Sequence, residues 1–393
     1  MLGAVIAGAL ATTVLVEPLS SQTPLLVHGT PVEVGSESRR VFMADVNGDR
    51  RADLVVLLRG GTVAVRLGDG SGRFSAGPTT GLASDPGAVA LADVSADGIL
   101  DLVVAWRDAA GEYVATSLGT GGGRFGPRQP AARLGAALEY YKPFVRVLDL
   151  NEDGVMDLVA GNERGPGFHV LLGIKQGRFT APEIVRYEPA GAEFYSCGFA
   201  DIDDDGHLDV VLTSTFAGPA GSGLLVRRGN GRGGFAGRLE MPLSVAGDPR
   251  VGAIGDLNGD AAPDLVVTHP EQRVLDVLFN DGRGRFTPAP WSPLRARLPA
   301  TAVAIADATG DARPDLVLLT VNSVVKPYES ELDVRVSSAR GFAPAPGSPF
   351  PVGPGAFALA AGDVNGDGRM DLATSSGETG LLTLLLTAPS NLR

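Results

Sequence analysis

The chain has 393 residues, a formal net charge of −12, 54 glycines, 28 prolines and a hydrophobic content of 44%. That hydrophobic content excludes a disordered chain, and the acidic charge argues against a nucleic-acid or anionic-membrane partner. The single cysteine, Cys197, excludes an internal disulfide and a zinc site built from cysteines.

Residues 1–21 form an apolar leader. Residues 2–16 carry no charge, and Ala9-Leu10-Ala11 has the small-x-small form of an export cleavage site, although the usual basic start is missing. We predict a signal peptide or its remnant, with a disordered or strand-like leader as the alternative, and a secreted, extracellular or periplasmic location. The leader is shorter than the roughly 20 apolar residues of a stable membrane span. No other stretch of the sequence approaches that length.

The segments 24–27 and 31–34 each begin with proline and continue with apolar residues. They look like an outer β-strand with no repeat of its own. The last of the repeats described below lacks an outer strand before the sequence ends at Arg393. We therefore predict that this N-terminal segment joins the last repeat, which would leave no long unpaired sheet edge.

One acidic pattern then occurs seven times. It reads Asp-x-(Asn/Asp/Ser/Thr)-x-Asp-x-x-x-Asp followed by an apolar run, and successive copies begin 48 to 56 residues apart. A glycine-rich turn that ends in phenylalanine follows each of the first six copies in phase. The acidic loops start at Asp45, Asp93, Asp149, Asp201, Asp256, Asp307 and Asp363. Two features that share one period indicate a repeat architecture.

Each repeat predicts four strands. In the first repeat, a strand over residues 41–44 enters the acidic loop, a second over 54–58 leaves it, and a third covers 62–67. A weaker fourth strand contains proline, which suits an outer edge where a missing N–H costs least. Four antiparallel strands in about 50 residues are the size of a propeller blade. We predict an all-β fold, a seven-bladed β-propeller of four-stranded antiparallel blades, as a single domain over residues 22–393.

The acidic loops are predicted cation sites. Oxygens at loop positions 1, 3 and 5 converge on one point, position 7 adds a backbone carbonyl, and a carboxylate at position 9 reaches back, by the logic of the EF-hand loop. All-oxygen ligation in a flexible loop favours Ca²⁺ over Mg²⁺. About half of the 45 acidic residues lie in these loops, where the carboxylates would repel each other without a cation. We predict up to seven bound Ca²⁺ ions.

The predicted ligands are the same five positions of every loop. They are Asp45, Asn47, Asp49, Arg51 and Asp53; Asp93, Ser95, Asp97, Ile99 and Asp101; Asp149, Asn151, Asp153, Val155 and Asp157; Asp201, Asp203, Asp205, His207 and Asp209; Asp256, Asn258, Asp260, Ala262 and Asp264; Asp307, Thr309, Asp311, Arg313 and Asp315; and Asp363, Asn365, Asp367, Arg369 and Asp371. Position 6 needs a left-handed backbone, which favours glycine. We rank the loops from Asp149, Asp201 and Asp363 strongest and the loop from Asp307 weakest.

The Asp loops and the Phe turns resemble the FG-GAP and VCBS-type repeats of integrin α-subunit propellers and of many bacterial secreted proteins. The resemblance covers about residues 22–393. It implies a seven-bladed propeller with calcium between the first two strands of a blade and ligand contacts on the opposite face. The Phe-Gly and Gly-Ala-Pro signatures of the family are only partly present, as in Phe125-Gly126. Every repeat here has an Asp loop, whereas integrins place calcium in only some blades.

Four aromatic residues and one lysine that precede the third and fourth Asp loops are candidate ligand-binding residues. They are Tyr140, Tyr141, Lys142, Phe194 and Tyr195, and we expect them on the face opposite the Asp loops. Tyrosines there would stack on a sugar or anchor a protein, with ordinary packing as the alternative.

The sequence contains no convincing catalytic constellation, because the four histidines lie far apart and form no metalloprotease motif. We predict a monomeric, non-catalytic binding or adhesion module for an extracellular protein or glycan. One alternative is a calcium-dependent carbohydrate-active enzyme similar to a polysaccharide lyase. The other is a structural spacer domain without a ligand.

Overall fold

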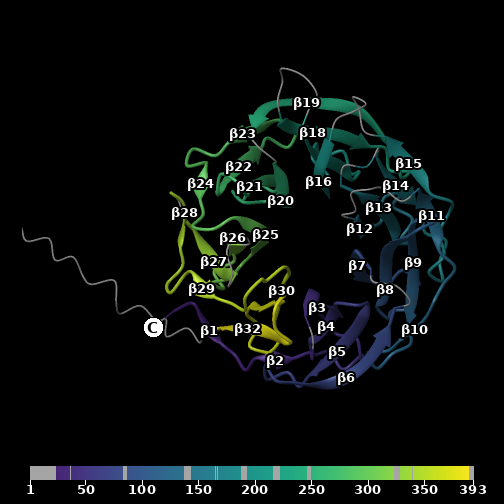
Figure 1. The fold of residues 1–393 in the computed structure, drawn as a ribbon. Helices are drawn as coiled ribbons and strands as arrows, with labels where there is room; N and C mark the ends of the chain where they lie inside the picture. Colours follow the sequence, from purple (N-terminus) through teal and green to yellow (C-terminus); the bar gives the residue numbers. More distant parts are fainter. Residues whose placement is uncertain are drawn as a thin grey trace, which may run out of the picture.

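A computed structural model describes residues 24–35, 37–82, 86–136, 143–163, 165, 167–186, 193–215, 222–245, 249–322, 328–338 and 340–388. The predicted leader over residues 1–21 lies outside this part of the chain. Seven antiparallel β-sheets form a ring, which confirms the predicted seven-bladed propeller (Figure 1). Within the described ranges, no helix is long and apolar enough to reach across a bilayer.

Each blade is built from the centre of the ring outwards, and we number the blades 1 to 7 by their inner strands. The inner strands are β3 (Ser38–Ala44), β7 (Ala88–Ala92), β12 (Pro143–Leu148), β16 (Glu193–Ala200), β20 (Arg250–Gly255), β25 (Ala300–Ala306) and β30 (Leu359–Gly362). Every second strand starts at the last aspartate of a loop. The second strands are β4 (Asp53–Leu58), β8 (Asp101–Asp108), β13 (Asp157–Asn162), β17 (Asp209–Thr215), β21 (Asp264–His269), β26 (Asp315–Asn322) and β31 (Asp371–Thr374).

The third and outer strands complete the blades. The third strands are β5 (Thr62–Gly68), β9 (Gly111–Gly119), β14 (Gly167–Leu171), β18 (Ser222–Gly229), β22 (Val274–Asn280), β27 (Glu329–Ser338) and β32 (Leu381–Thr387). The outer strands are β6 (Phe74–Gly81), β15 (Glu183–Arg186) and β19 (Phe235–Val245), and three that are split in two: β10 (Phe125–Arg128) with β11 (Ala132–Gly135), β23 (Phe286–Pro288) with β24 (Leu294–Arg295), and β28 (Gly341–Pro344) with β29 (Phe350–Pro351). As predicted, prolines occur in these edge strands.

The N-terminal segment closes the ring. Strands β1 (Leu26–His28) and β2 (Val32–Glu33) both pair antiparallel with β32, so the last blade contains both ends of the described chain (Figure 1). Leu26 lies opposite Thr387, and Val32 lies opposite Leu382. The predicted closure is therefore confirmed.

The core consists of seven apolar clusters, one between each pair of neighbouring blades. All six residues of β4 are buried. Leu54 and Val56 pack toward blade 7, while Val55 and Leu57 pack toward blade 2. Each such side chain contributes about 1.5–3 kcal/mol of burial energy. The second strands thus stabilise the ring by contacts on both of their faces.

The Phe turns explain why two sequence features share one period. Phe125 of blade 2 packs into the cluster between blades 1 and 2. In the turn before it, the Gly123 N–H donates to the carbonyl of Val46 in the Asp loop of blade 1 (2.9 Å), and Gly72 makes the same bond to Val364 (3.0 Å). Each of these turns rests on the Asp loop of the preceding blade. Between blades 6 and 7, Leu26 of the closing strand joins the cluster instead.

Candidate metal sites and binding surfaces

The position-1 aspartate folds each Asp loop around its own carboxylate. In the first loop, Asp45 Oδ1 accepts the backbone N–H groups of Asn47, Gly48 and Asp49, and Oδ2 accepts that of Arg50 at 2.7 Å. The bond from position 6 to position 1 occurs in all seven loops at 2.7–3.0 Å. The N–H of position 7 donates to the position-5 carboxylate in all seven at 2.8–3.0 Å.

The position-9 aspartate has a role that the sequence analysis missed. Asp53 is fully buried, and its carboxylate accepts the backbone N–H groups of Val46 (3.1 Å) and of Gly68 on the third strand (2.9 Å). The same pair of bonds occurs in all seven blades. This carboxylate therefore joins the loop to the second and third strands.

The position-9 carboxyls are electrostatically strained. Burial raises the pKa of each of them above its usual range, although two backbone N–H donors oppose that shift. In Asp209, the neighbouring carboxylates of Asp203 and Asp205 raise the pKa further. A divalent cation in the loop would act in the opposite sense and stabilise the ionised form.

Two positions in every loop have a left-handed backbone. Position 6 was predicted to need it, and its φ is positive even in Arg50 (66°), Ala261 (71°) and Ala312 (62°). Position 4 was not predicted, yet its φ is positive in Gly48, Ala96, Glu152, Asp204, Gly259, Gly310 and Gly366. Only the Asp363 loop has glycine at both positions, Gly366 and Gly368, so it has the least backbone strain.

The Asp201 loop fits a divalent cation best. Asp201, Asp203 and Asp209 each offer an oxygen, and these oxygens all lie within 4.8 Å of one another. Among the described residues, no other set of three acidic, histidine or cysteine side chains brings its ligand atoms this close together. The Asp203 side chain is only 6% exposed, and its Oδ2 pairs with Arg228 Nε at 2.7 Å. Its buried Oδ1 has no hydrogen-bond partner in the part of the chain that the structure describes. A buried carboxylate oxygen without a donor, among three carboxylates, matches the ligands that Ca²⁺ prefers.

The Asp307 loop fits a cation least well. Arg313 pairs with Asp311 within the loop, with Nη2–Oδ2 and Nε–Oδ2 distances of 2.5 and 2.9 Å. The guanidinium lowers the pKa of Asp311, which is the effect that a metal ion would otherwise have. Thr309 supplies only a neutral hydroxyl, which lies 3.4 Å from Asp307. These contacts agree with the low rank that the sequence gave this loop.

Loops with asparagine at position 3 lie between these two extremes. In three of them the side-chain amide donates to the position-5 carboxylate, at 3.2 Å from Asn47, 3.0 Å from Asn151 and 2.9 Å from Asn258. The uncharged amide thus occupies one oxygen of the position-5 carboxylate with a hydrogen bond from within the loop. Two neighbouring loops are also linked, because His207 Nδ1 lies 2.6 Å from the Glu152 carboxylate. The hydrogen bond to Glu152 raises the pKa of His207.

The predicted aromatic ligand surface stays a prediction. Tyr140, Tyr141 and Lys142 lie outside the described residues, and the side chains of Phe194 and Tyr195 are not described either. The backbone of Phe194 lies in β16, opposite Ser214 and at the end of the strand away from the Asp201 loop. This placement agrees with the expected face of the ring.

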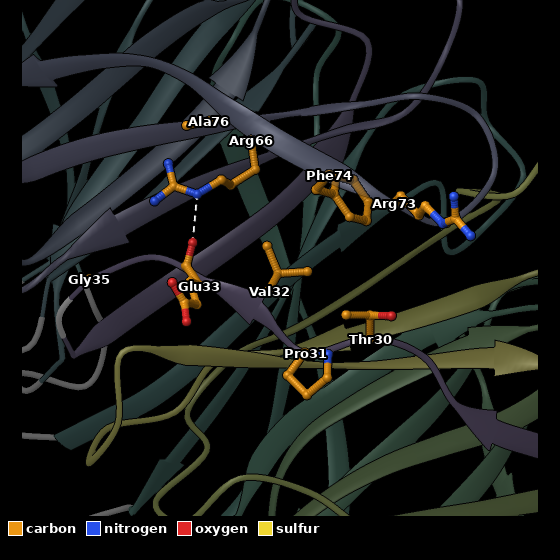
Figure 2. Close-up of a pocket in the computed structure, with 10 residues that line it drawn as sticks. Thr30, Pro31, Val32, Glu33, Gly35, Arg66, Arg73, Phe74 and Ala76 are labelled. Atoms are coloured by element: carbon orange, nitrogen blue, oxygen red, sulfur yellow. Dashed lines mark hydrogen bonds between the residues drawn. The ribbon is translucent and has the colours of Figure 1, made fainter.

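A pocket of 630 Å³ lies at the seam where the ring closes, between β2 and the outer part of blade 1 (Figure 2). Arg66 of β5 reaches across it, and its Nε donates to the backbone carbonyl of Glu33 at 2.6 Å. Burial lowers the pKa of Arg66. Arg73 and Phe74 line the pocket, with the two arginine side chains pointing apart (Figure 2). Arg66 therefore helps to hold the closing strand.

A cluster of Ser292, Asp276 and His269 has the residue types of a hydrolase triad but not its geometry. His269 Nε2 lies 3.0 Å from the Asp276 carboxylate, and Ser292 Oγ contacts the same carboxylate at 3.4 Å instead of the imidazole. Ser292 also accepts the backbone N–H of Val277. Blade 6 repeats the serine–aspartate contact between Ser348 and Asp333 without a histidine. The cluster is thus a structural link between the third and outer strands.

Comparisons with known proteins agree with the architecture. Models of the FG-GAP-like repeat match residues 45–104, 149–212 and 256–318, and a model of the FG-GAP repeat matches 355–385, together more than half of the chain. No curated protein matches. One similar solved structure is a lectin of Agrocybe aegerita that recognises non-reducing terminal N-acetylglucosamine, with 20% identity, a TM-score of 0.57, and coverage of 79% of this chain and 80% of the lectin. Another is BBS1N in complex with ARL6DN, with 14% identity, a TM-score of 0.59, and coverage of 94% and 99%.

Proposed function

We propose that this chain, which belongs to the FG-GAP-like repeat family, is a calcium-stabilised binding module that is exported and presents a surface to an extracellular glycan or protein. The observation that carries the calcium part is the Asp201 loop. There, three carboxylates lie together and Asp203 keeps one buried oxygen without a donor. The apolar leader supports export. Calcium binding in the roughly 10⁻⁴–10⁻³ M range of extracellular modules would be consistent with it, because the Asp loops are exposed.

Bound calcium would neutralise the clustered carboxylates. In the Asp201 loop the ligands would be Asp201, Asp203, Asp205 and Asp209 together with the His207 carbonyl. Asp209 also accepts N–H groups from Ile202 and Gly229, so a cation held there would connect the loop with the second and third strands. Because the Phe turns rest on Asp loops, the same ion would stiffen contacts between neighbouring blades. Its role is thus structural, and the binding surface lies elsewhere on the ring.

Two similar structures support the binding part of the proposal. The lectin recognises a terminal sugar, and BBS1N is in complex with the protein ARL6DN. Both structures have the ring fold found here. Their sequence identities to this chain are low and indicate a shared fold only, so the fold itself is suited to presenting loops to a glycan or a protein. The Ser292 cluster offers no nucleophile activated by a base, which favours binding over hydrolysis.

A glycan array and a panel of extracellular proteins, probed with the calcium-loaded chain, test the proposal. We expect saturable binding to a defined ligand that is lost in chelator and restored by Ca²⁺. Release of products from acidic polysaccharides would establish the enzymatic alternative instead. Failure to bind any glycan or protein, with the fold intact, would indicate a spacer domain. N-terminal sequencing of the exported protein tests whether the leader is removed.

A further inference from the structure

The inner strands of this acidic protein carry mainly positive charge. Of the charged residues on the seven inner strands, four are arginines, Arg39 and Arg40 on β3, Arg146 on β12 and Arg250 on β20, and one is an acid, Glu193 on β16. The whole chain has a net charge of −12. The inner strands around the centre of the ring therefore differ in charge from the chain as a whole.

Arg40 lines a cavity of 580 Å³ in the centre of the ring. The cavity is bordered by the inner strands β3, β25 and β30, which surround the axis in Figure 1, and by Leu91 of β7. Thr301 and Phe357 line it as well. Arg40, Thr301 and Phe357 each precede an Asp loop by five or six residues along an inner strand or its approach. They therefore lie at the end of the channel away from the Asp loops.

The guanidinium of Arg40 has no ion pair and no side-chain hydrogen bond to the described residues. Arg40 is exposed to solvent in the channel, but desolvation by the channel walls lowers its pKa, and the positive charge of Arg146 lowers it further. Among the described residues, the hydrogen bond of the Arg146 side chain goes to the carbonyl of Val145, at 3.0 Å. Arg250 differs, because it pairs with Glu163 at 3.1 Å. Arg40 thus has no carboxylate partner among the described residues, and the like charge of Arg146 makes an anion beside Arg40 more favourable.

An aromatic surface lies in the same cavity. Phe357 is 51% exposed, which makes it the most exposed of the large hydrophobic residues among those described. Its neighbours along the wall, Ala358, Leu359 and Ala360, also line the cavity and are apolar. Concave sites of 300–1,000 Å³ with apolar walls and a few convergent polar groups are typical for small ligands. This cavity combines a cationic group with an apolar wall.

We propose that the end of the central channel away from the Asp loops binds a small organic anion, with its carboxylate on Arg40 and its apolar body against Phe357. A guanidinium binds a carboxylate by parallel N–H···O bonds, so a carboxylate head fits Arg40 better than a neutral polar group. This site is separate from the Asp loops and does not depend on the proposed glycan or protein ligand.

The test is a calorimetric titration of the full, calcium-loaded chain with hexanoate, and with hexanol and acetate as the neutral and the tail-less analogues. We expect one hexanoate per chain, with hexanol and acetate each binding at least tenfold more weakly. Arg40→Gln should weaken hexanoate binding roughly tenfold or more, since it removes charge-assisted hydrogen bonds. Arg59→Gln is the charge-matched control, because Arg59 pairs with Glu37 at the surface outside the cavity. It should bind hexanoate as the wild type does.

Arg146→Gln provides an independent variant, because the Arg146 side chain is exposed and its loss should not disturb folding. It should also weaken hexanoate binding while leaving the melting temperature unchanged. The proposal is overturned if the wild type shows no saturable hexanoate binding, or if hexanol binds as well as hexanoate. Equal loss in Arg59→Gln and Arg40→Gln would also overturn it, because the effect would then reflect net charge and not the channel.

Discussion

The loops that start at Asp201 and Asp307 have the same backbone and different electrostatics. In both, position 6 donates to position 1, position 7 to position 5, and two backbone N–H groups to position 9. In the first, Asp203 holds a buried oxygen without a donor; in the second, Arg313 already neutralises Asp311. The repeat therefore fixes the shape of the loop, and we propose that side chains at positions 3 and 7 set its affinity for a cation.

The largest expected effect tests what the two loops share. Asp209→Asn and Asp315→Asn should each lower the free energy of unfolding of the metal-free protein by about 2–3 kcal/mol. The asparagine amide has only one accepting oxygen, so its NH₂ group would face a buried backbone N–H that the carboxylate had accepted. Urea denaturation in chelator measures both. A difference of more than about 1 kcal/mol between the two variants would show that the loops do not share one structural role.

The next prediction tests what the two loops do not share. Asp203→Asn should weaken the tightest calcium site roughly tenfold or more, because it removes a charged ligand. Thr309→Val, the matched change in the Asp307 loop, should leave that site unchanged. Competition with a calcium-sensitive chelator dye measures both affinities. Equal calcium binding by the wild type and Asp203→Asn would show that the Asp201 loop is not the tightest calcium site.

Arg313→Gln should bring the Asp307 loop closer to the Asp201 loop. Without the guanidinium, Asp311 regains a free carboxylate, and calcium should bind this loop several-fold more tightly, most clearly at low ionic strength. Titration of the variant beside the wild type should show one additional ion per chain. An unchanged stoichiometry would mean that Arg313 does not compete with the cation.

A smaller effect concerns the backbone. Ala312 has a φ of 62°, whereas the equivalent residue in the Asp201 loop is Gly206. A left-handed alanine costs about 1–2 kcal/mol, and glycine loses about 0.5–1 kcal/mol of that advantage through chain entropy. Ala312→Gly should thus stabilise the protein by up to about 1 kcal/mol, and Gly206→Ala should destabilise it by a similar amount. A lower urea midpoint for Ala312→Gly, or a higher one for Gly206→Ala, would contradict the proposed backbone strain at position 6.

The smallest effect is a change in local opening. Cys197 lies in the inner strand that leads into the Asp201 loop, is buried, and has its pKa raised to about 11, mainly by burial. At pH 8 it should react with a thiol reagent only when blade 4 opens, and chelation should speed that reaction. Trp291, packed on Phe342 between blades 5 and 6, is the matched probe in a Trp106→Phe background. The fluorescence of Trp291 should stay unchanged in chelator. If chelator changed both the Cys197 reaction rate and the Trp291 fluorescence, the two loops would not differ in the way proposed.

The fold was predictable because each repeat states the same pattern. Apolar residues on both faces of the second strand predict burial between blades. The apolar segments within residues 24–34 predict the strands that close the ring. The sites were predictable only in part. Position 9 was predicted as a ligand but not as the link to Gly68 and its equivalents, because that hydrogen bond joins residues 15 apart. The pairing of Asp203 with Arg228, and the place of Arg40 in the channel, depend on distant parts of the chain that no local pattern encodes.

The most direct test is a calorimetric calcium titration of the full chain, with the melting temperature recorded in Ca²⁺ and in chelator. We predict at least one bound Ca²⁺ per chain, first in the Asp201 loop, and a melting temperature that rises with free calcium, because a ligand of the folded state stabilises it by mass action. The absence of binding heat at millimolar Ca²⁺, together with the same melting temperature in chelator, would contradict the view that these acidic loops hold metal ions.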